Sequence, residues 1–414
     1  MKIAIIGTGI SGLSSAYLLH PHHEITVYES NAYIGGHSRT ITVATPEGQI
    51  PVDTGFIVYN ERNYPLLTGL FKHLNVPIAK SRMSFGVSIN DGWLEYSSQG
   101  LLAQYANICR PNFWRMIRDI LTFNRHALRE VRKNPDLSLG QFLDHMKLGA
   151  WFKHYYLQAM GAAIWSCSVK TILDFPAQTF LRFFENHGLL TINDHPQWYT
   201  VQGGSREYVS RLTAGFQDRI YLNRGVVSVR RDEGGVYVTD VGGMTERYDY
   251  AVMASHANQT LNMMADPSDQ EREILSAFTY QENHVVVHRD ISFMPKRKGC
   301  WASWMYLSQS RQDHAPVLSL SYWMNNLQPL QTSVPILVTL NPGREPEPGL
   351  IYDRYTFEHP IFDKRAVRAQ AHIEGIQGKN RLYFCGAYQR YGFHEDGLLS
   401  AVQAVKKLGV EVPW

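Results

Sequence analysis

The sequence predicts an α/β fold, and three features of its first 40 residues support that prediction. Lys2–Ile6 has the composition of a buried strand, and the pattern Gly7-x-Gly9-x-x-Gly12 follows it at the start of an expected helix. Glu29 ends a second short strand, about 20 residues after the glycine turn. A strand, a glycine turn, a helix and an acid in this order are typical of a Rossmann-like unit.

The glycine turn and the acid suit the ADP half of a dinucleotide. Gly7 and Gly9 let the chain turn tightly against a pyrophosphate, while Gly12 lets the helix lie close to the strand. Amides at the helix start, around Ser11, face the phosphates. Glu29 accepts hydrogen bonds from ribose hydroxyls and disfavours a 2′-phosphate, which argues against NADP. The alternative is an ordinary glycine-rich turn between a strand and a helix.

Length and composition narrow the class of protein. With 414 residues two domains are expected, and 44% hydrophobic with 19% charged residues is ordinary for a globular chain. A net charge of +3 is too small to indicate nucleic acid as a partner. The scattered cysteines (Cys109, Cys167, Cys300, Cys385) predict neither disulfides nor a metal site, and they suit a reducing cytoplasm.

No apolar run approaches the ~18 residues that span a bilayer, so a transmembrane helix is not expected. An apolar run does follow Lys2. However, glycines interrupt it and no small-x-small cleavage site follows, which argues against a signal peptide.

The dinucleotide-binding domain is expected to be assembled from discontinuous segments, residues 1–75, 200–260 and 376–414. Strand-like and helical runs mark these segments: a helix over Tyr64–His73, a helix after Gly203-Gly204, a strand over Arg381–Cys385 and a helix that opens at Gly397. The intervening blocks, 76–199 and 261–375, would form an inserted α+β substrate domain. The first block is mostly helical and aromatic, and the second is expected to begin with a strand over His284–His288 and to contain further alternating strand-like runs.

These pieces, in this order, resemble the flavin-containing amine oxidase superfamily, which includes monoamine oxidases, phytoene-type desaturases and protoporphyrinogen oxidase. Within it, Val52–Arg62 and Tyr391–Gly397 look most like a bacterial branch associated with cyclopropane-type fatty-acid modification. The resemblance implies a two-domain, amine-oxidase-like flavoprotein, FAD as the cofactor and a fatty-acyl substrate.

The resemblance also implies roles for individual residues. Gly35 and Gly36 would pass close to the pyrophosphate, and Val227 would hold the adenine through its backbone. Gly397, Leu398 and Leu399 would bring a helix start towards the flavin, where it favours the negative charge of the reduced ring. Further expected cofactor contacts are His37, Ser38, Arg39, Thr54, Gly55, Phe56 and Gly386.

Three departures from the family pattern affect the expected site. His37 stands where the family usually has arginine, so Arg39 is expected to supply the charge for the phosphates. Ala387 follows Gly386, where the family usually has an acid. Leu398 stands where amine-oxidising members place a tyrosine of their aromatic cage, which removes a cation–π partner and argues against amines.

Three residues are candidates for catalysis. His284 falls where amine oxidases carry a lysine near flavin N5, and it is either a group that positions water or substrate or a half-buried strand histidine. His394 and Glu395 precede the expected flavin-facing helix and would act as general acid or base. Asp396 is expected to be an N-cap, with Glu395 as a neighbour that complements the helix dipole.

The chain has no second GxGxxG pattern, so electrons are expected to come from the substrate and not from NAD(P)H. This predicts an FAD-dependent desaturase, oxidase or redox-neutral isomerase that acts on an apolar substrate, a fatty acyl chain or a phospholipid. A flavin-dependent amine oxidase and a non-catalytic flavin-binding subunit of a lipid-modifying complex are the alternatives.

Pro111–Lys133 is expected to form a long helix with an apolar side and a basic side. Its arginines are Arg115, Arg118, Arg125, Arg129 and Arg132. Two interpretations stay open: a basic amphipathic helix on the inner face of an anionic membrane, or a helix of the second domain whose arginines lie in solvent.

Overall fold

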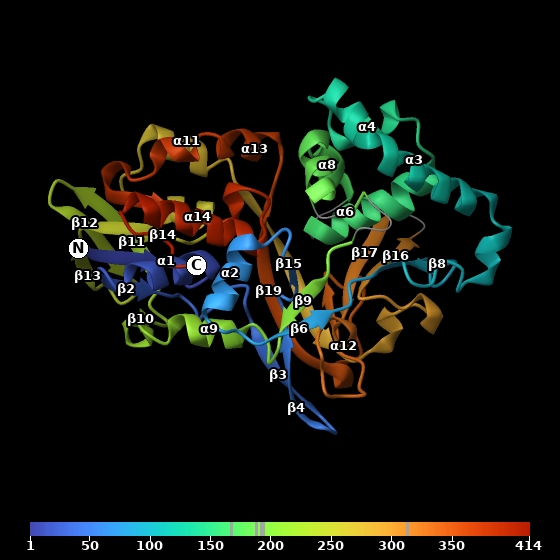
Figure 1. Ribbon diagram of the computed structural model, residues 1–414, viewed down its shortest axis with the longest axis horizontal. Helices are drawn as coiled ribbons and strands as arrows, with labels where there is room; N and C mark the ends of the chain where they lie inside the picture. The colour runs from blue at the N-terminus through green and yellow to red at the C-terminus, as the bar shows by residue number, and fades with distance from the viewer. Residues whose placement is uncertain (166–168, 187–188, 191–194, 312–313) are drawn as a thin grey trace.

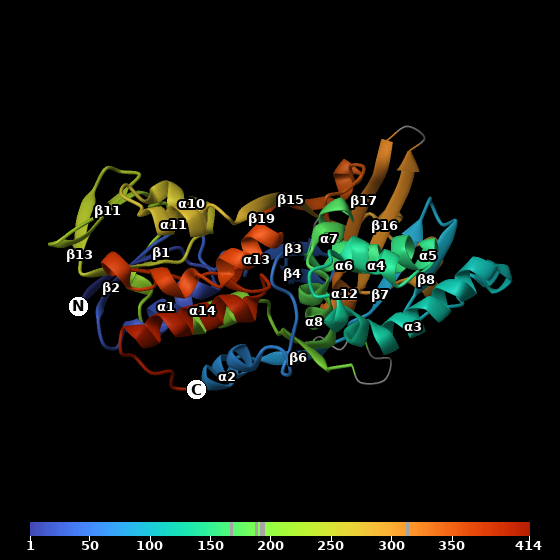
Figure 2. The same ribbon diagram turned by 90° about the horizontal axis from the view of Figure 1, so that it is seen from above.

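The computed structural model describes residues 1–165, 169–186, 189–190, 195–311 and 314–414; Cys167 lies outside them. Two halves, each built around a sheet, lie side by side (Figure 1). The half with the N-terminus also holds the C-terminal helix, and Figure 2 shows the same division from above. The structure therefore has the two-part α/β architecture that the sequence predicts.

A five-stranded parallel sheet forms the first half, in the order β10-β2-β1-β14-β20. Its strands come from distant parts of the chain: β1 (Lys2–Ile6), β2 (Glu24–Tyr28), β10 (Ile220–Tyr221), β14 (Tyr250–Met253) and β20 (Leu382–Phe384). The central strand β1 is buried on both faces because helices or strands cover each of them.

Alternate residues of β1 point into two hydrophobic cores. Ile3 and Ile5 pack on the face covered by α1 (Ile10–Leu19), α2 (Pro65–His73), α9 (Arg206–Thr213) and α14 (His394–Lys407). Ala4 and Ile6 pack on the other face, against a three-stranded sheet and three helices. These elements are β11 (Val226–Asp232), β12 (Gly235–Asp240), β13 (Thr245–Tyr248), α10 (Ala257–Met263), α11 (Asp269–Leu275) and α13 (Lys364–Gln370).

A seven-stranded sheet forms the second half, in the order β19-β15-β18-β17-β16-β7-β8, and only the β16–β7 pair in it is parallel. The strands are β7 (Phe85–Ile89), β8 (Leu94–Ser97), β15 (Thr279–His288), β16 (Trp304–Arg311), β17 (His314–Trp323), β18 (Leu337–Leu340) and β19 (Ile351–Ile361). Helices pack with Val87, Tyr96 and Tyr306 of this sheet. The helices of this half are α3 (Pro111–Lys133), α4 (Leu139–His145), α5 (Ala150–Phe152), α6 (Gln158–Trp165), α7 (Val169–Asp174), α8 (Ala177–Asn186) and α12 (Met324–Leu327).

Two small sheets lie between the halves. The hairpin of β3 (Thr40–Thr45) and β4 (Gly48–Asp53) packs with the strands β15, β17, β18 and β19. The strands β5 (Tyr59–Asn60), β9 (Trp198–Val201) and β6 (Ile78–Ser81) form the other sheet. The hairpin therefore links the segment that follows β2 to the seven-stranded sheet.

The structure corrects two expected elements. Helix α14 begins at His394, one turn before Gly397, so Gly397 lies inside the helix. Strand β15 is longer than the expected run from His284 and starts at Thr279. Among the described residues, no helix combines the length and apolarity needed to cross a bilayer.

Candidate functional site

A continuous cavity of about 1610 Å³ runs between the two halves. One end is formed by the glycine turn, and the other by α3, α6, α8 and the inner strands of the seven-stranded sheet. Cavities for a single drug-sized ligand measure about 300–1,000 Å³. The cavity therefore has room for a dinucleotide and a second molecule together.

The glycine turn has the geometry that a pyrophosphate needs. Gly7 has φ +105°, and a Cβ on Gly12 would lie 1.9 Å from the carbonyl oxygen of Gly7. A Cβ on Gly9 would meet nothing within 4 Å, and Gly9 lines the cavity. Ile10 and Ser11, the first residues of α1, line it too, and amides of the first helical turn have no intrahelical partner. The turn thus leaves space and donors where phosphates would bind.

Glu29 lies at the cavity wall with its carboxylate held in place. One oxygen accepts from the Thr8 amide at 3.0 Å and from the Thr8 hydroxyl, and the other accepts from the Asn31 amide at 2.8 Å. The Ser30 hydroxyl and the Asn31 side-chain amide also donate to this second oxygen, so five donors orient the carboxylate and a ribose hydroxyl would bind it by replacing a side-chain donor. The residues at this end of the cavity therefore fit the ADP half of FAD.

The segment after β2 closes over the turn. Gly36 has φ +58°, and a Cβ there would lie 3.0 Å from Cα of Gly9. Gly35 has φ +118°, and a Cβ there would lie 2.8 Å from the carbonyl oxygen of Ser38. Gly36 lines the cavity directly, whereas Gly35 shapes the loop behind it.

At the nucleotide end of the cavity, strand β11 carries a bulge. Its register with β12 skips Val227, which leaves the backbone of Val227 outside the regular ladder. The Val227 side chain is 51% exposed, and its neighbour Val226 lines the cavity. The expected backbone contact of Val227 with adenine remains a prediction.

Arg39 does not take the position expected for it. Its guanidinium donates to Asp353 at 2.7 Å and lies over the ring of Tyr355, outside the wall that the described residues form around the cavity. Thr54 also lies outside the wall and donates to the carbonyl of Arg39 at 3.1 Å. The guanidinium of Arg39, which was expected to contact the phosphates, therefore forms an ion pair with Asp353 instead.

His37 occupies the place next to the paired glycines at the cavity wall. Its ring stacks on Phe357 with centroids 4.6 Å apart and lies 5.2 Å from His359. Burial and the neighbouring histidines hold the pKa of His37 well below its usual range. Its Nε2 is buried without a hydrogen-bond partner among the described residues, so it can contact a bound group only as a neutral donor or acceptor.

Phe56 and His394 form a stacked pair on the cavity wall. Their rings are 4.0 Å apart at 11°, and His394 Nε2 lies 2.8 Å from the Tyr208 hydroxyl. Ser38 is buried behind them, hydrogen-bonded to Tyr208 and 3.3 Å from His394. The loss of solvation lowers the pKa of His394 to about 3, so its imidazole is neutral at pH 7. The site therefore presents an uncharged aromatic face here.

The lowered pKa of His394 predicts how stability depends on pH. Its folded-state pKa of about 3 lies below the unfolded value near 6.5, so its contribution to stability is full above pH 6.5 and is lost as the pH falls. We expect His394→Asn to reduce the slope of the free energy of unfolding against pH, between pH 6 and 4, by up to about 1.4 kcal/mol per pH unit. This reduction corresponds to the uptake of one proton on unfolding. Urea unfolding of both proteins in the same excess of FAD measures this difference, and parallel curves would contradict it.

Glu395 is a helix cap and not part of the cavity wall. Its two carboxylate oxygens accept from the amides of Leu66 and Leu67 at 2.9 and 3.0 Å, in the first turn of α2. Asp396 is not the N-cap of α14, because Phe393 holds that position. It is the third residue of α14 and accepts from the Phe393 amide at 3.0 Å. The catalytic role expected for Glu395 is therefore not supported by its position.

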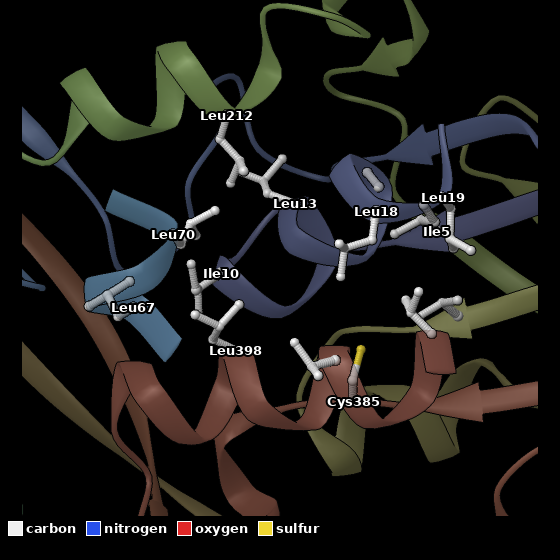
Figure 3. Packing of buried hydrophobic residues seen from close by; sticks show 14 of the residues in the cluster. Ile5, Ile10, Leu13, Leu18, Leu19, Leu67, Leu70, Leu212, Cys385 and Leu398 are labelled. Atoms are coloured by element: carbon white, nitrogen blue, oxygen red, sulfur yellow. The ribbon is translucent and has the colours of Figure 1, made fainter. Parts of the chain in front are cut away.

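Leu398 lies in the hydrophobic core and not beside the cavity. It is fully buried, and Figure 3 shows its side chain packed near Ile10 and Leu67. Gly397 allows this packing, since a Cβ there would lie 2.8 Å from Ile10. Leu399 faces a separate shallow pocket on the other side of α14. The expected aliphatic wall at Leu398 is wrong, and so is the argument against amines that rested on it.

His284 also lies away from the cavity wall formed by the described residues. Its exposed side chain is 3.2 Å from the hydroxyl of Thr356 on β19. His284 and His288 are four residues apart, but on a strand this places them about 13 Å from one another. In the described part of the chain, no cluster of His, Cys, Asp and Glu side chains could hold a metal ion.

Two other expected residues do reach the cavity. Gly55 lines it, and a Cβ there would lie 2.2 Å from the carbonyl oxygen of His37. Gly386 lines it at the end of β20, where its amide donates to Ser400 at 2.8 Å.

Sequence reasoning missed the distal wall of the cavity. Side chains from three helices form it together with aromatic residues of the sheet: Ile117 and Ile120 of α3, Tyr156, Met160 and Ile164 around α6, Phe183 of α8, Trp304 and Tyr322. The apolar side of the long helix was the available signal. It does not distinguish a core from a binding cavity.

The fold and the glycine turn at the cavity are those of an FAD-binding protein. A model of the flavin-containing amine oxidoreductase family matches residues 10–298, more than half of the sequence, and the chain belongs to this family. A Mycobacterium tuberculosis protein provisionally named flavin-containing monoamine oxidase AofH is 24% identical over 255 residues, 59% of this chain and 55% of the relative. The chain thus matches only about half the length of that relative.

Two solved structures share the fold over nearly the whole chain. The CLA-producing fatty acid isomerase from P. acnes has a TM-score of 0.67 and 15% identity, covering 99% of this chain and 98% of that protein. Cyclohexylamine oxidase from Brevibacterium oxydans has a TM-score of 0.67 and 14% identity, covering 99% of both chains. Identities this low establish the fold alone.

Proposed function

We propose that the protein oxidises, desaturates or isomerises an apolar substrate, a fatty acyl chain free or in a phospholipid. The observation that carries this proposal is the distribution of charge along the cavity. The acids that line it among the described residues are Glu29, Glu282 and Glu358, and none belongs to the distal wall. An acyl chain requires an apolar channel of this kind, whereas a diamine requires a carboxylate for its second ammonium group.

Two of these acids sit together near the nucleotide end. Glu282 and Glu358 face one another across β15 and β19, and Glu358 is 3.1 Å from Nδ1 of His256. The His256 contact lowers the pKa of Glu358, so this carboxylate is ionised at neutral pH. A cationic group of a substrate could therefore pair with a carboxylate near the nucleotide end, but not with one in the described part of the distal wall.

FAD, when bound, would supply a two-electron acceptor for hydride from a substrate carbon. The side chains at this wall of the cavity are uncharged, which suits a substrate that reacts at a hydrocarbon carbon. Phe56 and His394 present a flat neutral face, and burial raises the pKa of Tyr208, which keeps its hydroxyl protonated. The His394–Tyr208 contact fixes the ring of His394 in this orientation.

An amine oxidase is the second candidate, and the aromatic lining favours it. Trp198, Tyr391 and Phe393 line the cavity, and aromatic faces attract cations. A simple amine with one charge would not need an acid in the distal wall.

Anaerobic mixing of the holoprotein with acyl lipids and with amines separates these candidates. We expect long-chain fatty acids or phospholipids to bleach the flavin, or to be isomerised without net bleaching, as judged by product analysis. Rapid bleaching by a simple amine, with acyl substrates unchanged, would overturn the proposal. A holoprotein inert to both classes until a second polypeptide is added would point to a subunit of a complex.

A further inference from the structure

One surface of the second half is rich in exposed apolar side chains. It is formed by the turn before β8, the segment that includes the short helix Tyr105–Cys109, and the start of α3, far from the N-terminus (Figure 1). Its apolar members are 37–81% exposed: Trp93, Leu101, Leu102, Tyr105, Ile108 and Trp114. We call these six residues the distal patch. Exposed apolar groups gathered on one surface commonly mark an interaction site.

The distal patch is held in shape from beneath. The Gln104 amide, 3% exposed, donates to the carbonyl of Trp93 at 3.1 Å. The Trp114 indole donates to the carbonyl of Ile108 at 2.9 Å, and the guanidinium of Arg110 lies 5.0 Å from the ring centroid of Trp93. The apolar side chains therefore project from an ordered support.

Cations surround the distal patch. Glu95 and Asp119 are buried and accept from Arg297 and Arg118, and Asp91 pairs with Lys296 at 2.6 Å. Of these three carboxylates, Asp91 is exposed to solvent and the other two are buried. Arg118, Lys296 and Arg297 belong to these ion pairs, whereas Arg110, Arg115 and Lys298 form no ion pair with another described residue and leave the surface net positive. Tryptophan and tyrosine among arginines and lysines match the chemistry of an anionic lipid surface.

The distal patch is continuous with the cavity. Leu101 belongs to both, because it is 37% exposed and also lines the cavity. Ile117 and Ile120 of α3 line the cavity within two turns of Trp114. An apolar molecule that leaves a lipid layer at the patch would thus meet the distal wall of the cavity directly.

We propose that the distal patch docks on an anionic lipid bilayer and that acyl chains enter the cavity beside Leu101. The docking rests on the patch alone, while the entry of acyl chains rests also on the function proposed above. Tyr105 and Ile108 insert among the lipids, and the surrounding arginines and lysines contact the acidic headgroups.

Flotation of the holoprotein with phosphatidylcholine vesicles, with and without phosphatidylglycerol, tests the docking. We expect binding only with phosphatidylglycerol, weakened by high salt because headgroup contacts are screened. The double variant Tyr105→Ser/Ile108→Ser should bind at least about tenfold more weakly. The matched control is Val241→Ser/Met244→Ser, which removes side chains 62% and 56% exposed at the opposite end of the molecule and should bind like wild type.

Three outcomes would overturn the docking: no binding by wild type, equal loss in the control, or a dimer that the Tyr105→Ser/Ile108→Ser variant dissociates. Unchanged flavin absorbance in both variants shows that they fold and hold the cofactor. Vesicle binding without reaction of any acyl lipid would overturn the proposed function and the entry route, and it would leave the docking intact. Reaction of free fatty acids without vesicle binding would overturn the docking and leave the proposed function intact.

Discussion

Replacing Gly9 with valine is expected to weaken FAD binding severely while the fold survives. Gly9 has φ −65° and ψ 178°, a conformation open to any residue, and a Cβ there would meet no atom within 4 Å. The valine side chain would project into the space where the pyrophosphate would lie. Loss of about two amide contacts to a charged group costs about 4 kcal/mol, roughly a thousandfold in affinity.

Titration of the FAD-free protein with FAD, followed by quenching of flavin fluorescence, measures this loss. Gly12→Ala is the matched comparison, because its Cβ would lie 1.9 Å from the Gly7 carbonyl and would disturb the fold itself. We therefore expect Gly9→Val to unfold at the same temperature as FAD-free wild type and Gly12→Ala to unfold earlier. A Gly9→Val protein that retains stoichiometric FAD would show that the pyrophosphate does not lie against this turn.

The nucleotide end of the cavity was predictable because its geometry is local. Within about 30 residues the glycine spacing fixes the turn, and the acid falls at the end of the next strand. The structure places Gly9, Ser11 and Glu29 at one wall of the cavity, as this spacing predicts. The long helix α3 was predicted for a similar reason, since its apolar period lies within a single segment.

The other end of the site was not predictable because distant residues decide it. Glu395 caps a helix 328 residues earlier in the chain, and Arg39 pairs with an acid 314 residues later. A carboxylate before a helix has the same sequence pattern whether it caps its own helix or another one. Leu398 illustrates the same limit, because helical spacing cannot show which buried face of α14 meets the core and which meets a cavity.

The corrected position of Leu398 changes the basis of the substrate proposal. A single aliphatic residue no longer argues against amines, and the charge distribution along the whole cavity carries the argument instead. Many wall residues from α3, α6, α8 and the sheet contribute to this charge distribution. It also makes the distal wall the right place for a decisive substitution.

Ile120→Trp is expected to impair reaction with long acyl chains while FAD binding is unchanged. Ile120 lies on the distal wall of the cavity, and an indole there would occupy the space of about two or three methylenes of a substrate chain. Their lost burial amounts to about 2 kcal/mol, roughly thirtyfold in kcat/KM. Leu121→Trp is the matched control, since Leu121 is the next residue of α3 and is 48% exposed.

Acyl chains of graded length make this test specific. The loss in Ile120→Trp should grow with chain length, because only a long chain reaches the distal wall, and Leu121→Trp should react like wild type with every chain. Equal loss for short and long chains would mean that the indole disturbs the reacting end of the site. Unimpaired reaction of the longest chain in Ile120→Trp would show that the acyl chain does not lie along α3, and the substrate channel would then have to be sought elsewhere in the cavity.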